Sequence, residues 1–221
     1  MPHSTTPANS HAPGVFIALE GIDGAGKTTQ AKRLSERLSG LWPDRQIVLL
    51  HEPGSTALGE RIRRLVKEAR GTAIEPVAEL LLFAAARAQL VGEVITPALT
   101  AGAIVLCDRF TASTRAYQGF GRGIDPNVID QVEAVATGGV GPDINILFDV
   151  DVETALGRMK RVGARDRFES EDVAFYRQVR AGYLSAAQQR PDRWVVLDAG
   201  VGAGAVTKAM WAQVAGRLGV A

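Results

Sequence analysis

Five short apolar runs, each rich in β-branched residues, constrain the fold of this chain of 221 residues more than any other feature. Nearly continuous runs of this length are typical of strands that are covered on both faces. The runs are 15–19, 47–50, 104–107, 144–150 and 194–197. Longer stretches with helical spacing separate them, for example at Leu34, Leu38 and Leu41. This alternation predicts an α/β fold with a five-stranded parallel sheet and helices on both faces.

The termini and the overall composition bound the remaining possibilities. Residues 1–13 are rich in Ser, Thr, Pro, Ala and His and have no periodicity, so we expect a flexible tail before a single domain at 14–221. A net charge of +1 disfavours a protein that binds nucleic acid or a membrane surface through basic patches. No apolar run reaches the roughly 18 residues that a membrane-spanning helix needs. One cysteine fits a reducing compartment, and we expect a cytoplasmic protein.

A glycine-rich segment follows the first predicted strand and opens the first predicted helix. It reads Gly21-Ile22-Asp23-Gly24-Ala25-Gly26-Lys27-Thr28-Thr29 and matches the G-x-x-x-x-G-K-[ST] phosphate loop. The glycines let consecutive backbone N–H groups surround phosphate oxygens at a helix N-terminus. In such loops the lysine, here Lys27, reaches the β- and γ-phosphates, and the next hydroxyl, here Thr28, ligates Mg²⁺. The segment therefore predicts a P-loop NTPase fold that binds a nucleoside triphosphate.

The third predicted strand ends in an acid and a base, Asp108 and Arg109. Ligands of parallel sheets bind outside the carboxyl ends of the strands, and an acid there can hold Mg²⁺ directly or through water. We therefore predict that Asp108 and Thr28 form the metal site. The chain has no Asn-Lys-x-Asp motif, with which GTPases usually read guanine, so a GTPase is disfavoured.

Motifs along nearly the whole chain resemble those of bacterial thymidylate kinases, which are nucleoside monophosphate kinases of the P-loop class. The matching segments are 16–29, 51–54, 82–87, 108–110, 116–119, 121–125, 166–169 and 198–199, in the order of the family. The resemblance implies a homodimeric transferase of nucleotide biosynthesis. Such an enzyme moves the γ-phosphoryl group of ATP to dTMP with Mg²⁺ and yields dTDP and ADP.

The resemblance assigns several residues to the nucleoside part of dTMP. Phe83 would stack on the thymine ring, which needs a flat apolar surface. Arg87, one turn later on the same helix face, would reach a carbonyl of the base. Thr114 and Gln118 would complete the hydrogen bonds to the base edge. Tyr117 corresponds to a tyrosine that lies against the sugar and disfavours a 2′-hydroxyl.

The resemblance also assigns the phosphate end of the dTMP site. Arg63 and Arg109 match arginines that hold the dTMP phosphate, for which two-pronged Arg–phosphate pairing is suited. Asp23 matches a carboxylate close to the acceptor phosphate, and we expect an arginine or a metal ion beside it because bare like charges repel. Glu52 is also assigned to dTMP binding. Catalysis then consists of positioning and charge neutralisation by Lys27, Arg109 and Mg²⁺, without a general base.

A basic segment after the fourth predicted strand, at about 158–170, resembles the LID of the family. A closing basic lid excludes water and brings arginine charge to the transferred phosphoryl group. Some members carry this arginine in the phosphate loop, where this chain has Gly24, and others carry it on the LID. Arg158, Arg161 and Arg165 are therefore the candidates for the catalytic arginine.

Two positions depart from the family pattern, and two other functions stay open. The usual Arg-Glu-Pro-Gly-Gly becomes His51-Glu52-Pro53-Gly54-Ser55, so one acceptor-side arginine is replaced by a histidine. The enzymatic alternative is a deoxynucleoside kinase, in which Glu52 would act as the base for a nucleoside hydroxyl. The alternative of another class is a nucleotide-binding regulatory module without turnover.

Overall fold

The computed structural model describes residues 13–68, 73–162 and 171–220, with the backbone alone at 161 and 162. Its strands are β1 (Val15–Glu20), β2 (Ile47–His51), β3 (Ile104–Asp108), β4 (Ile144–Asp149) and β5 (Trp194–Asp198). All five pair in parallel in the order β2-β3-β1-β4-β5. The predicted five-stranded parallel sheet is therefore confirmed, and each strand end lies within one residue of its prediction.

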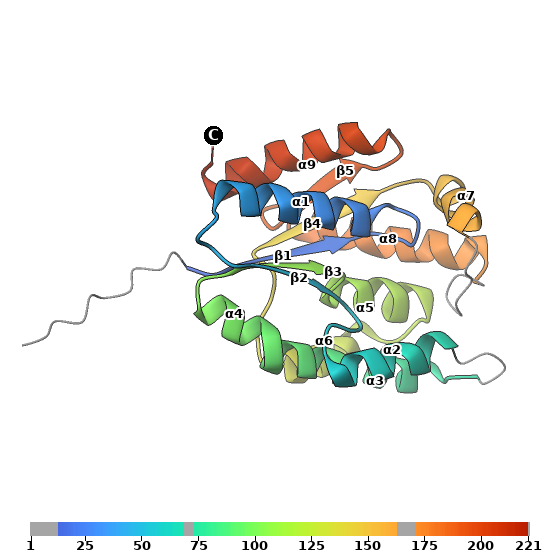
Figure 1. The fold of residues 1–221 in the computed structure, drawn as a ribbon. Coiled ribbons are helices and arrows are strands. Elements are labelled where there is room, and N and C mark those ends of the chain that lie inside the picture. Colours follow the sequence, from blue (N-terminus) through green and yellow to red (C-terminus); the bar gives the residue numbers. More distant parts are fainter. Residues whose placement is uncertain (1–12, 69–72, 163–170, 221) are drawn as a thin grey trace, which may run out of the picture.

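Helices cover both faces of this sheet. They are α1 (Lys27–Leu41), α2 (Ala57–Glu68), α3 (Pro76–Leu90), α4 (Thr96–Thr100), α5 (Thr111–Thr114), α6 (Pro126–Thr137), α7 (Val152–Val162), α8 (Val173–Gln189) and α9 (Ala203–Leu218). Two π-helical segments, η1 (Val91–Ile95) and η2 (Arg115–Gly121), continue α3 and α5. Figure 1 shows α1 and α9 above the sheet and α3, α4 and α6 below it. No described helix is long and apolar enough to cross a membrane.

The core follows from the alternation of side chains along buried strands. Ile17 and Leu19 of β1 belong to one cluster of buried side chains, whereas Phe16 and Ala18 belong to the other. All four are fully buried, since successive side chains of a strand point to opposite faces of the sheet. Each large aliphatic side chain buried in this way stabilises the fold by about 1.5–3 kcal/mol. The continuous apolar pattern of the runs is thereby explained.

The parallel register brings the polar strand ends to one edge. Leu19 of β1 pairs with Asp108 of β3, and His51 of β2 pairs with the same residue. The residues that end the five strands are Glu20, His51, Asp108, Asp149 and Asp198. Every strand therefore delivers a titratable side chain to the edge at which ligands bind in such sheets.

Parts of the predicted domain plan lie outside the described residues. Residues 163–170 of the predicted LID belong to this group, while 158–162 form the end of α7. The tail at 1–13 and the single domain at 14–221 stay predictions.

Candidate active site

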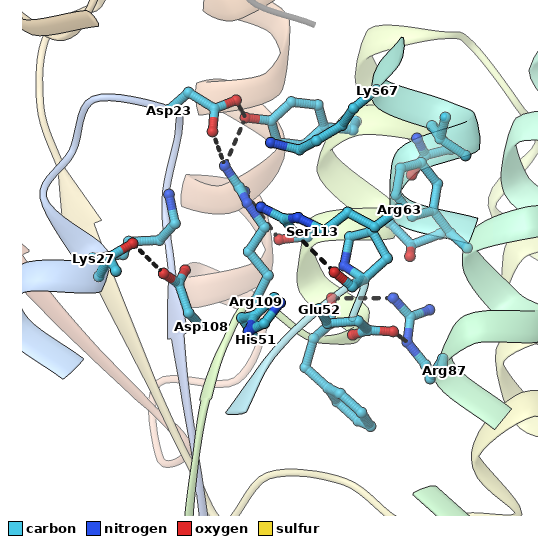
Figure 2. Close-up of a pocket in the computed structure, with 18 residues that line it drawn as sticks. Asp23, Lys27, His51, Glu52, Arg63, Lys67, Arg87, Asp108, Arg109 and Ser113 are labelled. Carbon is cyan, nitrogen blue, oxygen red and sulfur yellow. Dashed lines mark hydrogen bonds and ion pairs between the residues drawn. The ribbon is translucent and has the colours of Figure 1, made fainter. Parts of the chain in front are cut away.

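A cavity opens at the carboxyl edge of the sheet, beside the ends of β1, β2 and β3 (Figure 2). It brings together residues that are far apart in the sequence. Those predicted for a site are Asp23, Lys27, Thr28, Glu52, Arg63, Phe83, Arg87, Asp108, Arg109, Thr114, Tyr117 and Gln118. Residues predicted for a phosphate loop and residues predicted for a base-binding site thus line one space.

The loop between β1 and α1 has the backbone of a phosphate cradle. Gly21, Gly24 and Gly26 have φ angles of 139°, 80° and 90°, which side chains rarely allow. Gly24 is also packed closely, since a Cβ there would lie 2.3 Å from the carbonyl oxygen of Ala155. The first N–H groups of α1, which begins at Lys27, have no partner within the helix and can face an anion.

Lys27 and Thr28 face different partners at the start of α1. Lys27 is buried, and its Nζ donates to the carbonyl oxygen of Ile22 at 3.0 Å. Burial, together with the nearby charge of Arg109, lowers the pKa of Lys27 to about 8. Thr28 Oγ1 donates to Asp108 Oδ2 at 2.6 Å, so the two oxygens predicted for the metal are in contact.

The donor set at this point suits Mg²⁺. Magnesium prefers oxygen ligands, and it is usually bound through one or two carboxylates together with water and substrate phosphates. Thr28 and Asp108 supply a hydroxyl and a carboxylate beside the phosphate loop. Among the described residues there is no group of three or more His, Cys, Asp or Glu side chains that could hold a metal. A site completed by phosphate oxygens is therefore the arrangement that these side chains fit.

Arg109 links the loop to the cavity. Its Nη2 lies 2.7 Å from Asp23 Oδ1, and its Nη1 donates to the carbonyl oxygen of Gly21 at 3.0 Å. Tyr117 donates its hydroxyl proton to the other oxygen of Asp23 at 2.8 Å. Burial by itself would raise the pKa of Asp23, but the charges of Arg109 and Lys27 outweigh burial and hold the pKa below its ordinary value. An arginine therefore lies beside Asp23, which is one of the two partners, arginine or metal ion, that the sequence led us to expect.

Arg109 is supported by a chain of hydrogen bonds in which the donor and the acceptor of each bond can be assigned. Ser113 Oγ is 2.6 Å from Glu20 Oε2, and because a carboxylate only accepts, the serine donates. Tyr183 must then donate its own proton to Ser113, at 2.7 Å. The oxygen of Tyr183 is left to accept from Arg109 Nη1 at 2.9 Å. The backbone of Arg109 has a φ of 76°, so these hydrogen bonds support a residue in a strained backbone conformation.

Glu20, Ser113 and Tyr183, which form these hydrogen bonds behind Arg109, were not predicted from the sequence. Glu20 carried a signal, because a charged residue that ends a buried strand needs partners. Ser113 lies four residues after Arg109, but nothing in the sequence connects Tyr183 of α8 with either residue. Lys67 was also missed; it lines the cavity one helical turn after Arg63 on α2.

Arg87 lies in a buried cluster with two carboxylates. Its Nε is 2.6 Å from Glu52 Oε1, although the N–H is not aligned for a hydrogen bond, and its Nη1 is 3.3 Å from Glu133 Oε1. Its Nη2 donates weakly to the carbonyl oxygen of Phe110 at 3.4 Å. Burial raises the pKa of Glu52 to about 7 in spite of the charge of Arg87, and it does the same for Glu133. Arg87 is therefore fixed in the cavity wall.

The other predicted dTMP residues surround the same space. Phe83 is half-buried and Thr114 is buried, and both line the cavity. Arg63 Nη1 donates to the carbonyl oxygen of Pro53 at 2.8 Å, which holds it over the loop after β2 (Figure 2). Gln118 Nε2 donates to Glu79 Oε1 at 2.8 Å. The sequence did not single out Glu79.

The LID candidates have different outcomes. Arg158 Nη1 donates to the carbonyl oxygen of Ala199 at 2.9 Å and lies 3.5 Å from that of Gly24. It thus lies between the phosphate loop and the segment after β5. The side chain of Arg161 and the whole of Arg165 lie outside the described residues.

The two departures from the family pattern contact each other. His51 Nε2 is 2.8 Å from Glu60 Oε1, and Ser55 Oγ is 3.2 Å from His51 Nδ1. The backbone N–H of Ser55 donates to the same Glu60 oxygen at 2.9 Å. His51 therefore connects the end of β2 to α2 through Glu60, and it lines the cavity at the position where the family pattern has an arginine.

Comparison with known proteins agrees with this geometry. The family model described as thymidylate kinase matches residues 19–209. The thymidylate kinase of Trichlorobacter lovleyi is 45% identical over 212 residues, which cover 93% of this chain and 99% of that protein. The thymidylate kinase of Deinococcus radiodurans is 45% identical over 204 residues, which cover 92% and 98%.

A solved structure agrees as well. The crystal structure of thymidylate kinase from Ehrlichia chaffeensis superposes with a TM-score of 0.70 at 38% sequence identity, over 84% of this chain and 93% of that chain. The predicted P-loop fold and the predicted resemblance are both confirmed. From the phosphate loop to the last helix, this chain belongs to the thymidylate kinase family.

Proposed function

We propose that this protein is a dTMP kinase, which transfers the γ-phosphoryl group of ATP to a phosphate oxygen of dTMP and yields dTDP and ADP in the cytoplasm. The ion pair between Asp23 and Arg109, at 2.7 Å, carries the proposal. It joins the phosphate loop to the cavity lined by Phe83, Arg87 and Gln118. Donor and acceptor phosphates can therefore meet at Arg109.

The donor side is formed by the loop and the start of α1. Backbone N–H groups of residues 21–29 would surround the ATP phosphates, and Lys27 would exchange the carbonyl of Ile22 for phosphate oxygens. Thr28 and Asp108 would hold Mg²⁺, directly or through water. When bound, the ion would neutralise charge on the β- and γ-phosphate oxygens.

The acceptor side is formed by arginines on two elements. Arg63 and Arg109 would hold the dTMP phosphate, and Asp23 would keep Arg109 in place. An oxygen of dTMP would attack the γ-phosphorus while the bond to the bridging oxygen of ADP breaks. The acceptor is already ionised at neutral pH, so proximity and positive charge are the contributions required from the protein.

The nucleoside would occupy the remaining cavity. Phe83 would stack on thymine, while Arg87, Thr114 and Gln118 would face its polar edge. Tyr117 would lie against the sugar. Glu52 would act indirectly, because its closest described contact is with Arg87.

The LID would complete the site. We propose that Arg158 supports the phosphate loop through its contacts with Gly24 and Ala199. The catalytic charge would then come from Arg161 or Arg165. A side chain at position 24 would bring its Cβ to 2.3 Å from the carbonyl oxygen of Ala155, which supports the proposal that the catalytic arginine of this chain is on the LID and not in the phosphate loop.

The competing functions differ in their products. A deoxynucleoside kinase would use Glu52 as a base, but Glu52 is buried and paired with Arg87. A regulatory module would bind ATP without releasing ADP. The test is ADP release with Mg²⁺ and ATP, measured with dTMP and with thymidine as acceptors. We expect turnover with dTMP; faster turnover with thymidine, or none with either acceptor, would overturn the proposal.

We also propose that the enzyme is a homodimer through the outer surface of α2 and α3. These helices pack against each other at one border of the molecule (Figure 1). The large apolar side chains that they expose are Leu58, Leu65, Val77 and Leu81. Light scattering should give about twice the 23.5 kDa of one chain. Leu65→Glu should give the single-chain mass, whereas Val201→Glu, before α9, should leave the dimer intact.

A further inference from the structure

The amide of Gln118 is held by a buried carboxylate. Gln118 Nε2 donates to Glu79 Oε1 at 2.8 Å, and the two residues are 2% and 0% exposed. Glu79 lies in the first turn of α3 and Gln118 in η2, 39 positions apart in the sequence. A buried hydrogen bond between two such elements fixes the side chain that lines the cavity.

Arg122 keeps the carboxylate of Glu79 in its role as an acceptor. Its Nε lies 3.4 Å from Glu79 Oε1 and its Nη2 lies 3.5 Å from Oε2. The same guanidinium pairs with Glu171 at 2.7 Å and lies over the ring of Phe175. Since a guanidinium only donates hydrogen bonds, Glu79 faces donors from both Arg122 and Gln118.

This arrangement decides which end of the Gln118 amide meets a ligand. A carboxamide has a donor group and an acceptor oxygen. The donor group is committed to Glu79, so the oxygen, Oε1, is the atom left for the cavity. Thymine carries a donor at N3, whereas cytosine carries a lone pair there. An acceptor that faces N3 therefore favours thymine, and facing lone pairs disfavour cytosine.

We propose that Glu79 is a positioning residue for base selection, which fixes the amide of Gln118 so that Oε1 accepts the N3–H of the pyrimidine. The inference rests on the proposed function, because it requires the base of dTMP to occupy the cavity beside Gln118. It assigns no contact between Glu79 and the substrate. It connects a fully buried residue to the choice between dTMP and dCMP.

The substitution Glu79→Gln tests this connection. A glutamine of the same size can keep its oxygen toward Arg122 and turn its NH₂ toward Gln118, which lets the Gln118 amide invert. The ratio of kcat/KM for dTMP to that for dCMP should then fall at least about tenfold. The inverted amide replaces the hydrogen bond between Oε1 and the N3–H of thymine with a repulsive contact between two donors. The ratio for dTMP to dUMP should stay the same, because both bases carry N3–H.

Two controls separate positioning from general damage. Glu75→Gln, at the exposed N-cap of the same helix, makes the same chemical change away from Gln118 and should leave both ratios unchanged. In a Gln118→Leu background, Glu79→Gln should cause no further loss of dTMP preference, because its effect passes through Gln118. Equal losses of kcat/KM for dTMP and dCMP in Glu79→Gln would overturn the inference.

A measurement on the unmodified enzyme covers the case in which Glu79→Gln does not fold. The side-chain NH₂ protons of Gln118 should exchange with solvent more slowly than those of Gln89, which donates to Glu93 on an exposed helix surface. Equally fast exchange would contradict the proposed hold on Gln118. Absence of dTMP phosphorylation by the unmodified enzyme would instead refute the proposed function and leave the Glu79–Gln118 bond as a structural feature.

Discussion

Tyr183 accepts a hydrogen bond from Arg109 Nη1 at 2.9 Å, which connects α8 to the loop after β3. Arg109 is proposed to bind the dTMP phosphate, and α8 follows the predicted LID in the sequence. Removal of the hydroxyl in Tyr183→Phe keeps the ring but leaves one Arg109 donor without this partner. We expect the KM for dTMP to rise about fivefold, since such a bond contributes about 1 kcal/mol.

Steady-state kinetics with dTMP and ATP varied in turn would measure this effect. The KM for ATP should change little in Tyr183→Phe, because Arg109 is assigned to the acceptor. An equal rise in both KM values would show that α8 supports the whole site rather than Arg109.

Lys27→Ala should abolish turnover, because Lys27 is assigned to the β- and γ-phosphates of ATP in the proposed site. Binding of dTMP, measured by calorimetry without ATP, should remain because the acceptor contacts come from other elements. Lys32→Ala is the matched control, since Lys32 lies on the exposed side of the same helix. An active Lys27→Ala enzyme would contradict the assignment of the phosphate loop.

Gly24→Ala should lower both stability and turnover. The new Cβ would lie 2.3 Å from the carbonyl oxygen of Ala155, and the φ angle of 80° disfavours any side chain. We expect a loss of about 1–3 kcal/mol in the free energy of unfolding. Gly40→Ala, where a Cβ would meet no atom within 4 Å, should be neutral or stabilising by up to about 1 kcal/mol. Denaturant unfolding of both variants would compare the two.

The buried Glu52 should make stability depend on pH. Its pKa is raised from 4.5 to about 7 in the folded protein, chiefly by burial. Its contribution to stability is therefore complete below pH 4.5 and is lost as the pH rises through 7. Glu52→Gln removes this titration.

The free energy of unfolding of Glu52→Gln minus that of the unmodified protein should therefore increase between pH 5 and pH 8. The change should be on the order of 1–3 kcal/mol. A difference that stays constant or decreases over this range would show that Glu52 is stabilised, rather than penalised, as a buried anion.

Much of the fold could be predicted from local pattern. Runs such as 104–107 are apolar at every position, which is typical of a strand buried on both faces, and the phosphate loop marked the first turn into a helix. The resemblance supplied Arg87 and Gln118 as site residues. Local pattern could not predict the carboxylates that contact these two residues. Glu79 and Glu133 are ordinary charged positions on helices in the sequence, and they meet Gln118 and Arg87 only when the helices pack.

Tyr183 shows the same limit over a longer separation. It lies 74 positions from Arg109 in the sequence, and its hydroxyl can accept the hydrogen bond from Arg109 only because α8 packs beside the end of β3. The His51 and Ser55 departures were visible in the sequence, but their shared contact with Glu60 depends on the geometry of the loop after β2. Tertiary contacts, and not residue types, define these partners.

The most direct test follows the fate of the transferred group. The unmodified enzyme would be incubated with Mg²⁺, dTMP and ATP that carries a labelled γ-phosphorus, and the nucleotides would be separated. We expect dTDP with the label in its terminal phosphate, together with ADP in equal amount. Label that appears only in inorganic phosphate, or that reaches thymidine but not dTMP when both are offered, would contradict the proposed function.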